Sequence, residues 1–484
     1  MNGPIRRLGA ALFVGFAVLL FAVTWFQVVR ADELKTDPRN PRPALADRGK
    51  ERGLIVSADG TVLARSVPDP ADPRSFVRQY PEGPAFAHVV GYSSFLVGAS
   101  GLEAEYSAQL RSRRDLTISD LVAVILGQDL RPKTVEVTLD PTLQRLAFDA
   151  LGEHKGAVVA MDPRSGAVLA AVSKPSFDPS LLNGLDAAEQ WNRLLEDPDR
   201  PLSDRATREL YPPGSTFKTV VAATGLDTGK VTPATEFADP AQFQLPNSTA
   251  TISNFDGGPC VDGQTATLLQ AFVRSCNTIF ADLAIQLGAE DIGITAAALG
   301  FNRDIEFEWE VADAAFPVQE LEDDPAALGQ SGIGERDVRA TPLHMAMVTA
   351  AVANEGMVAS PFLMQRVVDA NGETLTATEP ALMRAMSAET AVVLTQMMER
   401  VVTEGTGRRA AVPGVRVAGK TGTATGQGGF PHTWFIGFAP VAEPQIAVAV
   451  FVEGSPISGE TASGGSTAAP IAAGLIENWV GRQS

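Results

Sequence analysis

The pattern of hydrophobic and polar positions begins with one long apolar run near the N-terminus. Arg6 and Arg7 precede the run 8–29, which contains no charged residue. A helix of this length, at about 1.5 Å per residue, reaches roughly 33 Å and can cross a hydrocarbon core of about 30 Å. The run ends without the small-x-small cleavage site of a signal peptide. We predict a cytoplasmic tail (1–7), a single transmembrane anchor (8–29) and an extracytoplasmic remainder.

Short alternating segments follow a polar, proline-bearing linker. The apolar runs 53–56 and 62–64 flank Asp59-Gly60, which predicts a hairpin. The segments 101–113 and 118–126 have helical patterns. This part contains no cluster of catalytic residue types, and we predict that 30–135 forms a small domain of its own close to the membrane.

The remaining segment, 136–484, contains longer elements. Alternation over 135–139 predicts a strand, and Asp140 followed by Pro141 predicts the N-terminus of a helix reaching 152. Strands are also expected at 156–161, 166–173, 415–420, 434–438 and 446–452, helices at 187–196, 216–228, 268–299, 341–353, 388–403 and 468–479, and a loop at the Gly/Ser tract 463–466. Strands at both ends with helices between them predict an α+β fold, an antiparallel sheet packed by helices.

The composition bears on the number of domains, on nucleic-acid binding and on disulfide formation. A chain of 484 residues with 45% hydrophobic and 20% charged residues can form two or three domains with a large core. Its net charge of −18 argues against nucleic-acid binding, which requires a basic surface. Both cysteines, Cys260 and Cys276, fall in the predicted exported part, where they are candidates for a disulfide. Two buried thiols that never meet remain the alternative.

Three short motifs carry candidate chemistry. Each occurs once, in the order Ser215-Thr216-Phe217-Lys218, Ser275-Cys276-Asn277 and Lys420-Thr421-Gly422-Thr423. Together they match the S-x-x-K, S-x-N and K-T-G set of serine acyl-transfer enzymes. The order and the single copies make the combination specific, although each motif alone is weak.

The motifs supply the groups that an acyl transfer through serine requires. Ser215 is the predicted nucleophile, and Lys218, one helical turn away, is the predicted base. Burial and the nearby charge of Lys420 are expected to lower the lysine pKa. Ser275 is expected to relay a proton, and Asn277 to hold a peptide backbone. None of the four histidines lies in a nucleophile motif, and neither a metal site nor a cofactor is predicted.

The third motif is predicted to end a strand that binds an extended ligand along a sheet edge. Gly422 permits close approach of the ligand, and the hydroxyls of Thr421 and Thr423 are suited to a carboxylate. The backbone N–H groups of Ser215 and Thr423 form the predicted oxyanion hole.

These motifs and several others resemble the class B penicillin-binding proteins, in particular the actinobacterial penicillin-binding protein A group. The further similarities are 101–103, 155–160, 211–215, 341–343 and 432–440. The resemblance covers about 140–484 closely and the part nearer the membrane loosely, and it implies that 30–135 is a non-catalytic pedestal or dimerisation-like domain. The resemblance implies a serine β-lactamase-like transpeptidase domain in which Ser215 attacks the D-Ala–D-Ala bond of peptidoglycan stem peptides. It also implies covalent inhibition by β-lactam antibiotics, a role in cell-wall synthesis during division, and glycosyltransferase or divisome partners.

Related activities remain as alternatives. The E-x-x-[LT]-N pattern with which class A β-lactamases activate water is absent after Ser275. A D,D-carboxypeptidase would use the same acylation with water as the acceptor, and the sequence leaves it open as a side activity. A β-lactam sensor or scaffold would keep the motifs, but a tail of seven residues offers no signalling output.

Overall fold

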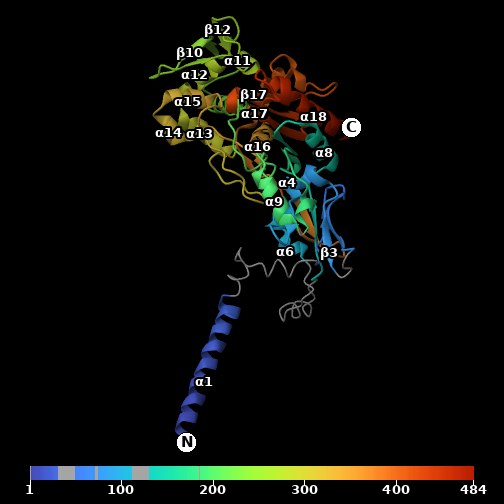
Figure 1. Cartoon of the computed structure of the whole chain (residues 1–484). Coiled ribbons are helices and arrows are strands. Elements are labelled where there is room, and N and C mark those ends of the chain that lie inside the picture. The colour runs from blue at the N-terminus through green and yellow to red at the C-terminus, as the bar shows by residue number, and fades with distance from the viewer. Residues whose placement is uncertain (1, 31–49, 71–74, 112–129, 185, 484) are drawn as a thin grey trace.

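The computed structural model describes residues 2–30, 50–70, 75–111, 130–184 and 186–483 (Figure 1). Helix α1 (Asn2–Thr24) continues into the π-helix η1 (Trp25–Val29), and both are exposed along their length. Within the described residues, the segment Gly3–Val29 is the one helix long and apolar enough to cross a membrane, with a mean hydropathy of 2.3. The predicted helix 118–126 lies outside the described residues.

A five-stranded antiparallel sheet forms the centre of the larger half of the molecule. Its order is β17-β18-β19-β7-β8, with the bounds β17 (Ala418–Ala424), β18 (His432–Ala439), β19 (Ile446–Val452), β7 (Gly156–Met161) and β8 (Val168–Lys174). Both faces are covered, so alternate side chains of one strand join different layers: Val158 packs in one core and Val159 in the other. This explains why the strands appear as continuous apolar runs in the sequence.

Helices cover the two faces of this sheet. One face packs against α8 (Pro141–Ala150) and α18 (Ala469–Gln483), which lie side by side (Figure 1). Asp140 caps α8 by accepting a hydrogen bond of 2.7 Å from the Leu143 N–H, as predicted. The other face packs against α16 (Pro342–Ala353), which is buried on all sides, and against α17 (Ala388–Thr403), which lies on β17. Helix α10 (Lys218–Asp227) packs against α17.

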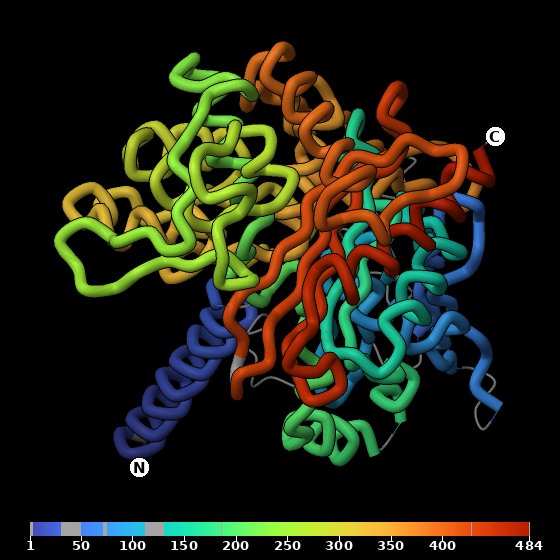
Figure 2. The backbone as a smooth tube through the Cα atoms, turned by 90° about the horizontal axis from the view of Figure 1, so that it is seen from above, coloured from blue at the N-terminus to red at the C-terminus, as the bar shows by residue number. Residues whose placement is uncertain are grey.

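A helical lobe stands on one side of the sheet, green to yellow beside the orange and red strands in Figure 2. It contains α11 (Leu268–Arg274), α12 (Asn277–Leu287), α13 (Ala289–Ala298), α14 (Val318–Glu322) and α15 (Pro325–Gly332). Two small ladders lie at its outer end, β9 (Glu236–Ala238) with β12 (Thr265–Thr267) and β10 (Gln242–Gln244) with β11 (Thr251–Ser253).

A second sheet lies in the pedestal. Its order is β15-β14-β6-β1-β2-β3, with the bounds β15 (Thr374–Ala377), β14 (Met364–Val368), β6 (Thr134–Val137), β1 (Ile55–Val56), β2 (Val62–Pro68) and β3 (Phe76–Gln79). The predicted hairpin around Asp59-Gly60 is therefore present as β1 and β2. The boundary predicted between 135 and 136 falls inside β6, and β14 and β15 come from the second predicted domain. The pedestal sheet is thus built from both parts of the chain.

The remaining elements are short. They are η2 (Gly83–Phe86), α4 (Ala87–Val90), β4 (Ser93–Ser94), β5 (Gly98–Ala99), α5 (Gly101–Glu105), α6 (Ser107–Leu110), η3 (Pro179–Leu182), α9 (Ala187–Glu196), η4 (Gly214–Thr216), β13 (Met357–Ala359), β16 (Leu382–Arg384), η5 (Arg408–Ala410), η6 (Gln427–Gly429) and η7 (Gly464–Ala468). The loop predicted at 463–466 is wrong, because Ser463 caps the π-helical turn η7 there. Gly464 packs so tightly that a Cβ would lie 2.2 Å from the Trp434 carbonyl oxygen.

Candidate active site

Ser215 lies in the 3-10 turn η4, immediately before α10. Gly214 precedes it with φ +52°, and a Cβ there would lie 2.5 Å from the Thr423 carbonyl oxygen. Only glycine therefore allows the turn to approach β17 this closely. The predicted helix 216–228 begins later than expected, since regular α-helix starts at Lys218. Its first residues are buried in the core, which holds the turn in place.

Lys218 is fully buried at the first position of α10. Its Nζ donates hydrogen bonds of 2.7 Å to the Ser275 carbonyl oxygen and 2.7 Å to Asn277 Oδ1. Among the described residues, no hydrogen bond joins the Ser215 hydroxyl to Lys218. The structure thus places the predicted base beside the second motif, one turn from the nucleophile.

Ser275 joins two helices. It ends α11 in the left-handed conformation, with φ 66°, and Asn277 begins α12 two residues later. Lys420, which is also fully buried, donates a hydrogen bond of 2.8 Å from its Nζ to Ser275 Oγ. The backbone of Ser275 therefore contacts one lysine and its hydroxyl contacts the other.

Burial lowers the pKa of both lysines. For Lys218, desolvation is the larger cause and repulsion by Lys420 adds to it, so its pKa lies well below the ordinary value. Desolvation lowers the pKa of Lys420 to about 7. A neutral amine can accept a proton, and a lysine with a pKa near the working pH can also donate one. The pair can therefore move protons on both sides of Ser275.

The third motif lies on β17, the edge strand of the sheet. Gly422 faces the serine turn, where a Cβ would lie 2.8 Å from the Pro213 carbonyl oxygen. The Thr421 hydroxyl shares a hydrogen bond of 2.6 Å with the Thr406 hydroxyl, and the Thr423 hydroxyl accepts one of 3.3 Å from the Gly464 N–H. Both hydroxyls thus have protein partners besides any ligand carboxylate.

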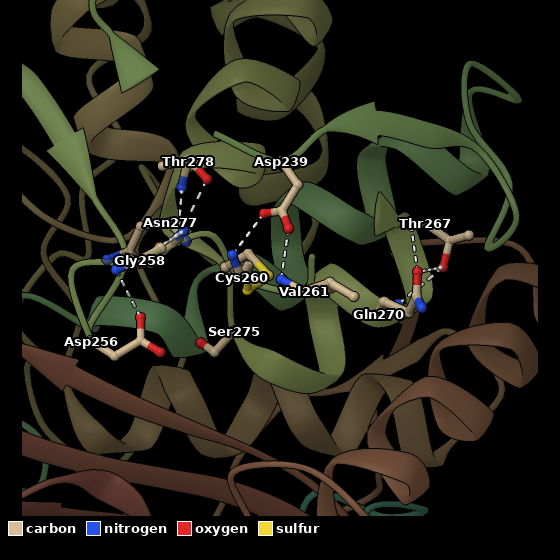
Figure 3. Close-up of a disulfide and its surroundings, with 12 residues drawn as sticks. Asp239, Asp256, Gly258, Cys260, Val261, Thr267, Gln270, Ser275, Asn277 and Thr278 are labelled. Carbon is tan, nitrogen blue, oxygen red and sulfur yellow. Dashed lines mark hydrogen bonds between the residues drawn. A yellow bond between two sulfur atoms is a disulfide. The ribbon is translucent and has the colours of Figure 1, made fainter. Parts of the chain in front are cut away.

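Cys260 and Cys276 are joined by a disulfide with a Cα–Cα distance of 5.7 Å (Figure 3). Asp239 holds the same loop, because its carboxylate accepts N–H hydrogen bonds of 2.8 Å from Cys260 and 2.6 Å from Val261. The Asn254 side chain accepts a hydrogen bond of 2.8 Å from the Asn277 N–H. The loop before α11 is therefore fixed to the start of α12 by a covalent and a polar contact.

Sequence reasoning missed the residues that support the three motifs. Asn254, Asp239 and Thr406 contact the site from positions far along the chain, and no motif marks them. The flanking glycines of Thr406 were the one visible signal of a tight turn. The structure brings together the eight residues predicted from the three motifs, which are Ser215, Lys218, Ser275, Asn277, Lys420, Thr421, Gly422 and Thr423. Within the described residues, no group of three or more His, Cys, Asp or Glu side chains could hold a metal ion.

Comparisons with known proteins agree with this geometry. Residues 156–477 match the penicillin binding protein transpeptidase domain, and residues 52–135 match the penicillin binding protein A dimerisation domain. The chain is 39% identical to the peptidoglycan D,D-transpeptidase PbpA of Mycolicibacterium smegmatis, covering 98% of both chains. It is 38% identical to PbpA of Mycobacterium tuberculosis, covering 99% of both.

Two solved structures are similar to this chain over most of its length. Penicillin-binding protein A from M. tuberculosis, as a ceftriaxone acyl-enzyme complex, superposes with a TM-score of 0.82 and 36% identity, over 90% of this chain and 99% of that one. The D,D-transpeptidase domain from Eggerthella lenta gives a TM-score of 0.79 and 34% identity, over 90% and 99%. The chain belongs to the class B penicillin-binding proteins, the serine-type peptidoglycan D,D-transpeptidases, and lies close to the actinobacterial PbpA group.

Proposed function

We propose that this protein cross-links peptidoglycan stem peptides through an acyl-enzyme on Ser215. The observation that carries the proposal is a pair of fully buried lysines, both with lowered pKa values, that contact Ser275. Lys218 lies one helical turn after Ser215, and Lys420 lies on the neighbouring strand β17. A serine hydroxyl needs such a base to become a nucleophile at neutral pH.

The acylation step follows from these positions. Ser215 Oγ attacks the carbonyl carbon of the D-Ala–D-Ala bond while its proton passes to neutral Lys218. The backbone N–H groups of Ser215 and Thr423 stabilise the negative oxygen. Lys420 and Ser275 then deliver a proton to the departing amine, and the C–N bond breaks to release D-alanine.

The transfer step restores the enzyme. An amine on a second stem peptide attacks the ester carbonyl, the bond to Ser215 Oγ breaks, and the proton of the amine returns to the serine through the lysines. Asn277, which is fixed by Asn254 and Lys218, is positioned to hold the backbone of the donor peptide. Thr421 and Gly422 line the edge of β17 along which that peptide lies.

Inhibition by β-lactams follows from the same chemistry. A β-lactam carbonyl acylates Ser215, and the opened ring leaves no free amine to depart. The proposal is supported by one relative, penicillin-binding protein A from M. tuberculosis, which was solved as ceftriaxone and imipenem acyl-enzyme complexes.

The cellular setting is proposed on the family and on the N-terminal helix. The helix 8–29 anchors the protein once, with Arg6 and Arg7 on the cytoplasmic side and the catalytic part outside. We place the protein in cell division, with a glycosyltransferase or divisome proteins as partners of the pedestal. Depletion should then produce cells that fail to divide, whereas a change in cell width would assign it to elongation.

Intact mass of the full-length protein in detergent tests the activity. Incubation with benzylpenicillin should give one adduct that persists for hours and maps to Ser215, and Ser215→Ala should give none. A D-Ala–D-Ala peptide with an amine acceptor should yield D-alanine and an aminolysis product. An adduct that disappears as the drug is turned over would indicate a β-lactamase, and hydrolysis that the amine does not divert would indicate a carboxypeptidase.

A further inference from the structure

Glu335 has no part in the reaction described above, although it lies beside the nucleophile turn. It follows Gly334, whose carbonyl oxygen accepts a hydrogen bond of 2.9 Å from the Gly214 N–H. A Cβ on Gly334, which has φ +80°, would lie 2.0 Å from the Gly214 carbonyl oxygen. The backbone that carries Glu335 is therefore in contact with the turn that carries Ser215.

The Glu335 carboxyl also reaches the end of the ligand-binding strand. Its Oε1 accepts a hydrogen bond of 3.0 Å from the Thr425 N–H. The Thr423 carbonyl oxygen faces Gly214 in the nucleophile turn, and the N–H and C=O of one strand residue point to the same edge. The N–H of Thr423 therefore faces the free edge of β17, and Glu335, which binds Thr425 just after the end of β17, lies beyond the oxyanion hole along that edge.

The charge of Glu335 is not neutralised by a fixed cation. Among the described residues it forms no ion pair, and the Arg339 guanidinium donates instead to the carbonyl oxygens of Arg336 and Val338. Burial raises the pKa of Glu335, while hydrogen bonds from Thr425 and the charge of Arg339 oppose that effect. The side chain remains partly exposed and Thr425 is exposed, so a ligand on the strand edge can reach the carboxyl.

We propose that Glu335 binds an ammonium group of the stem peptide that lies along the free edge of β17. The proposal rests on the proposed function, because it takes the same peptide along the same edge. A peptide that extends along β17 past Thr423 brings its following residue to the Glu335 carboxyl. Every transpeptidation also requires an amine, because an amine accepts the acyl group. The ammonium has two sources, a side chain of the donor peptide or the attacking strand before it loses its proton.

A structural role makes a different prediction. If Glu335 only ties the loop after α15 to β17, then the amide oxygen of Glu335→Gln can accept the same hydrogen bond from Thr425. The substitution removes the charge and keeps the acceptor. Glu308→Gln is a matched control, since Glu308 is also half-buried and accepts N–H hydrogen bonds, of 2.6 Å from Leu363 and 2.7 Å from Met364, near the pedestal sheet.

The experiment uses the full-length protein in detergent in wild-type, Glu335→Gln and Glu308→Gln forms. Three rates are measured: acylation by benzylpenicillin, which has no amine, and D-alanine release from a D-Ala–D-Ala peptide with a free side-chain amine and from its N-acetylated form. The ratio of aminolysis to hydrolysis is measured with an added amine. Failure of the wild type to bind benzylpenicillin would contradict the proposed function itself.

With Glu335→Gln, acylation by benzylpenicillin should stay within about twofold, while one amine-dependent rate falls about tenfold, the effect of one charged hydrogen bond. Loss of the preference for the free-amine donor assigns the site to the donor, and a lower aminolysis ratio with an unchanged donor assigns it to the acceptor. The Glu308→Gln control should alter neither. Unchanged amine-dependent rates, or a fall in all rates together, would overturn the proposal.

Discussion

Two buried clusters of charged side chains differ in how their charges are paired. In the active site, Lys218 and Lys420 are both fully buried, and no carboxylate pairs with either among the described residues. In the pedestal, Glu103 is fully buried between Arg52, whose Nη2 lies 2.8 Å from its carboxylate, and Arg78, whose Nε lies 2.5 Å from it. Arg78 also donates to the Gly53 carbonyl oxygen at 2.7 Å.

The pairing of the buried charges indicates whether a cluster serves structure or reactivity. Opposite charges that are hydrogen-bonded inside a fold fix the segments that carry them, here β3 and α5. Burial lowers the pKa of both lysines, and for Lys218 the charge of Lys420 adds to this effect, so both shift toward the neutral amine. The pedestal cluster is thus expected to control stability, and the active-site lysines to control the acylation rate.

Lys218→Met should have the largest effect, on rate alone. The variant removes the base but keeps most of the apolar side chain, so acylation by a fluorescent penicillin should slow by on the order of 10³-fold. Its melting temperature should change little, because the lost hydrogen bonds are offset by the removal of a buried polar amine. Acylation within tenfold of wild type would remove Lys218 from the role of base.

Glu103→Gln should have the next largest effect, on stability alone. It leaves two buried guanidinium groups without a counter-charge, which costs about 3–5 kcal/mol of folding free energy. Thermal unfolding should show a clear fall in the melting temperature, whereas protein that is still folded should acylate normally. The control is Glu82→Gln, because the Glu82–Arg145 pair is more exposed and should contribute less than about 1 kcal/mol.

Removal of the disulfide should affect both properties moderately. Replacing Cys260 and Cys276 by serine frees a loop with a sequence separation of 16, for which the loop-entropy model gives about 3 kcal/mol. Acylation should slow by about tenfold, since Asp239 and Asn254 still hold the loop near Asn277. Reduction of the wild type should reproduce both changes, and an unaffected rate would limit the bond to stability.

The smallest effect concerns pH and Lys420. Its pKa is about 7 in the folded protein against 10.5 in the unfolded chain, so between these values only the unfolded chain binds the proton. Wild-type stability should therefore rise with pH in this window, by up to about 1.4 kcal/mol per pH unit from this group. Lys420→Met removes the share of the rise that comes from Lys420 and leaves the share of Lys218, whose pKa is also lowered. Chemical denaturation of both proteins at pH 6 and pH 9 measures it, and an equal difference between them at both pH values would contradict the lowered pKa.

Local pattern was enough to predict most elements of the fold. The strand 446–452 and the helices 187–196 and 388–403 have the bounds that periodicity gave them, because each keeps one pattern between clear turn signals. The composition of the pedestal sheet could not be predicted. Its strand β6 pairs with β14, and no local signal indicates that two segments so distant in sequence share a register.

The residues of the three motifs could be predicted from the sequence, whereas the residues that hold the motifs in place could not. Ser275 and Lys420 stand in short patterns whose chemistry is readable from residue type. Asn254 and Glu335 act through contacts that the fold creates, and an asparagine or a glutamate in a loop resembles any solvated residue. Burial, which lowers the pKa of Lys420, is also a property of the packed structure rather than of the motif.

The shared pedestal sheet also sets an order of assembly. A ribosome makes β1, β2, β3 and β6 early, but β14 arrives much later, as the Arg366–Glu136 contact across 230 residues records. Until then β6 has one unpaired edge, which is open to mispairing with other chains. The edge of β6 must therefore stay protected from other chains while the protein is being synthesised. A fragment that ends before residue 364 would lack β14, the strand that covers this edge.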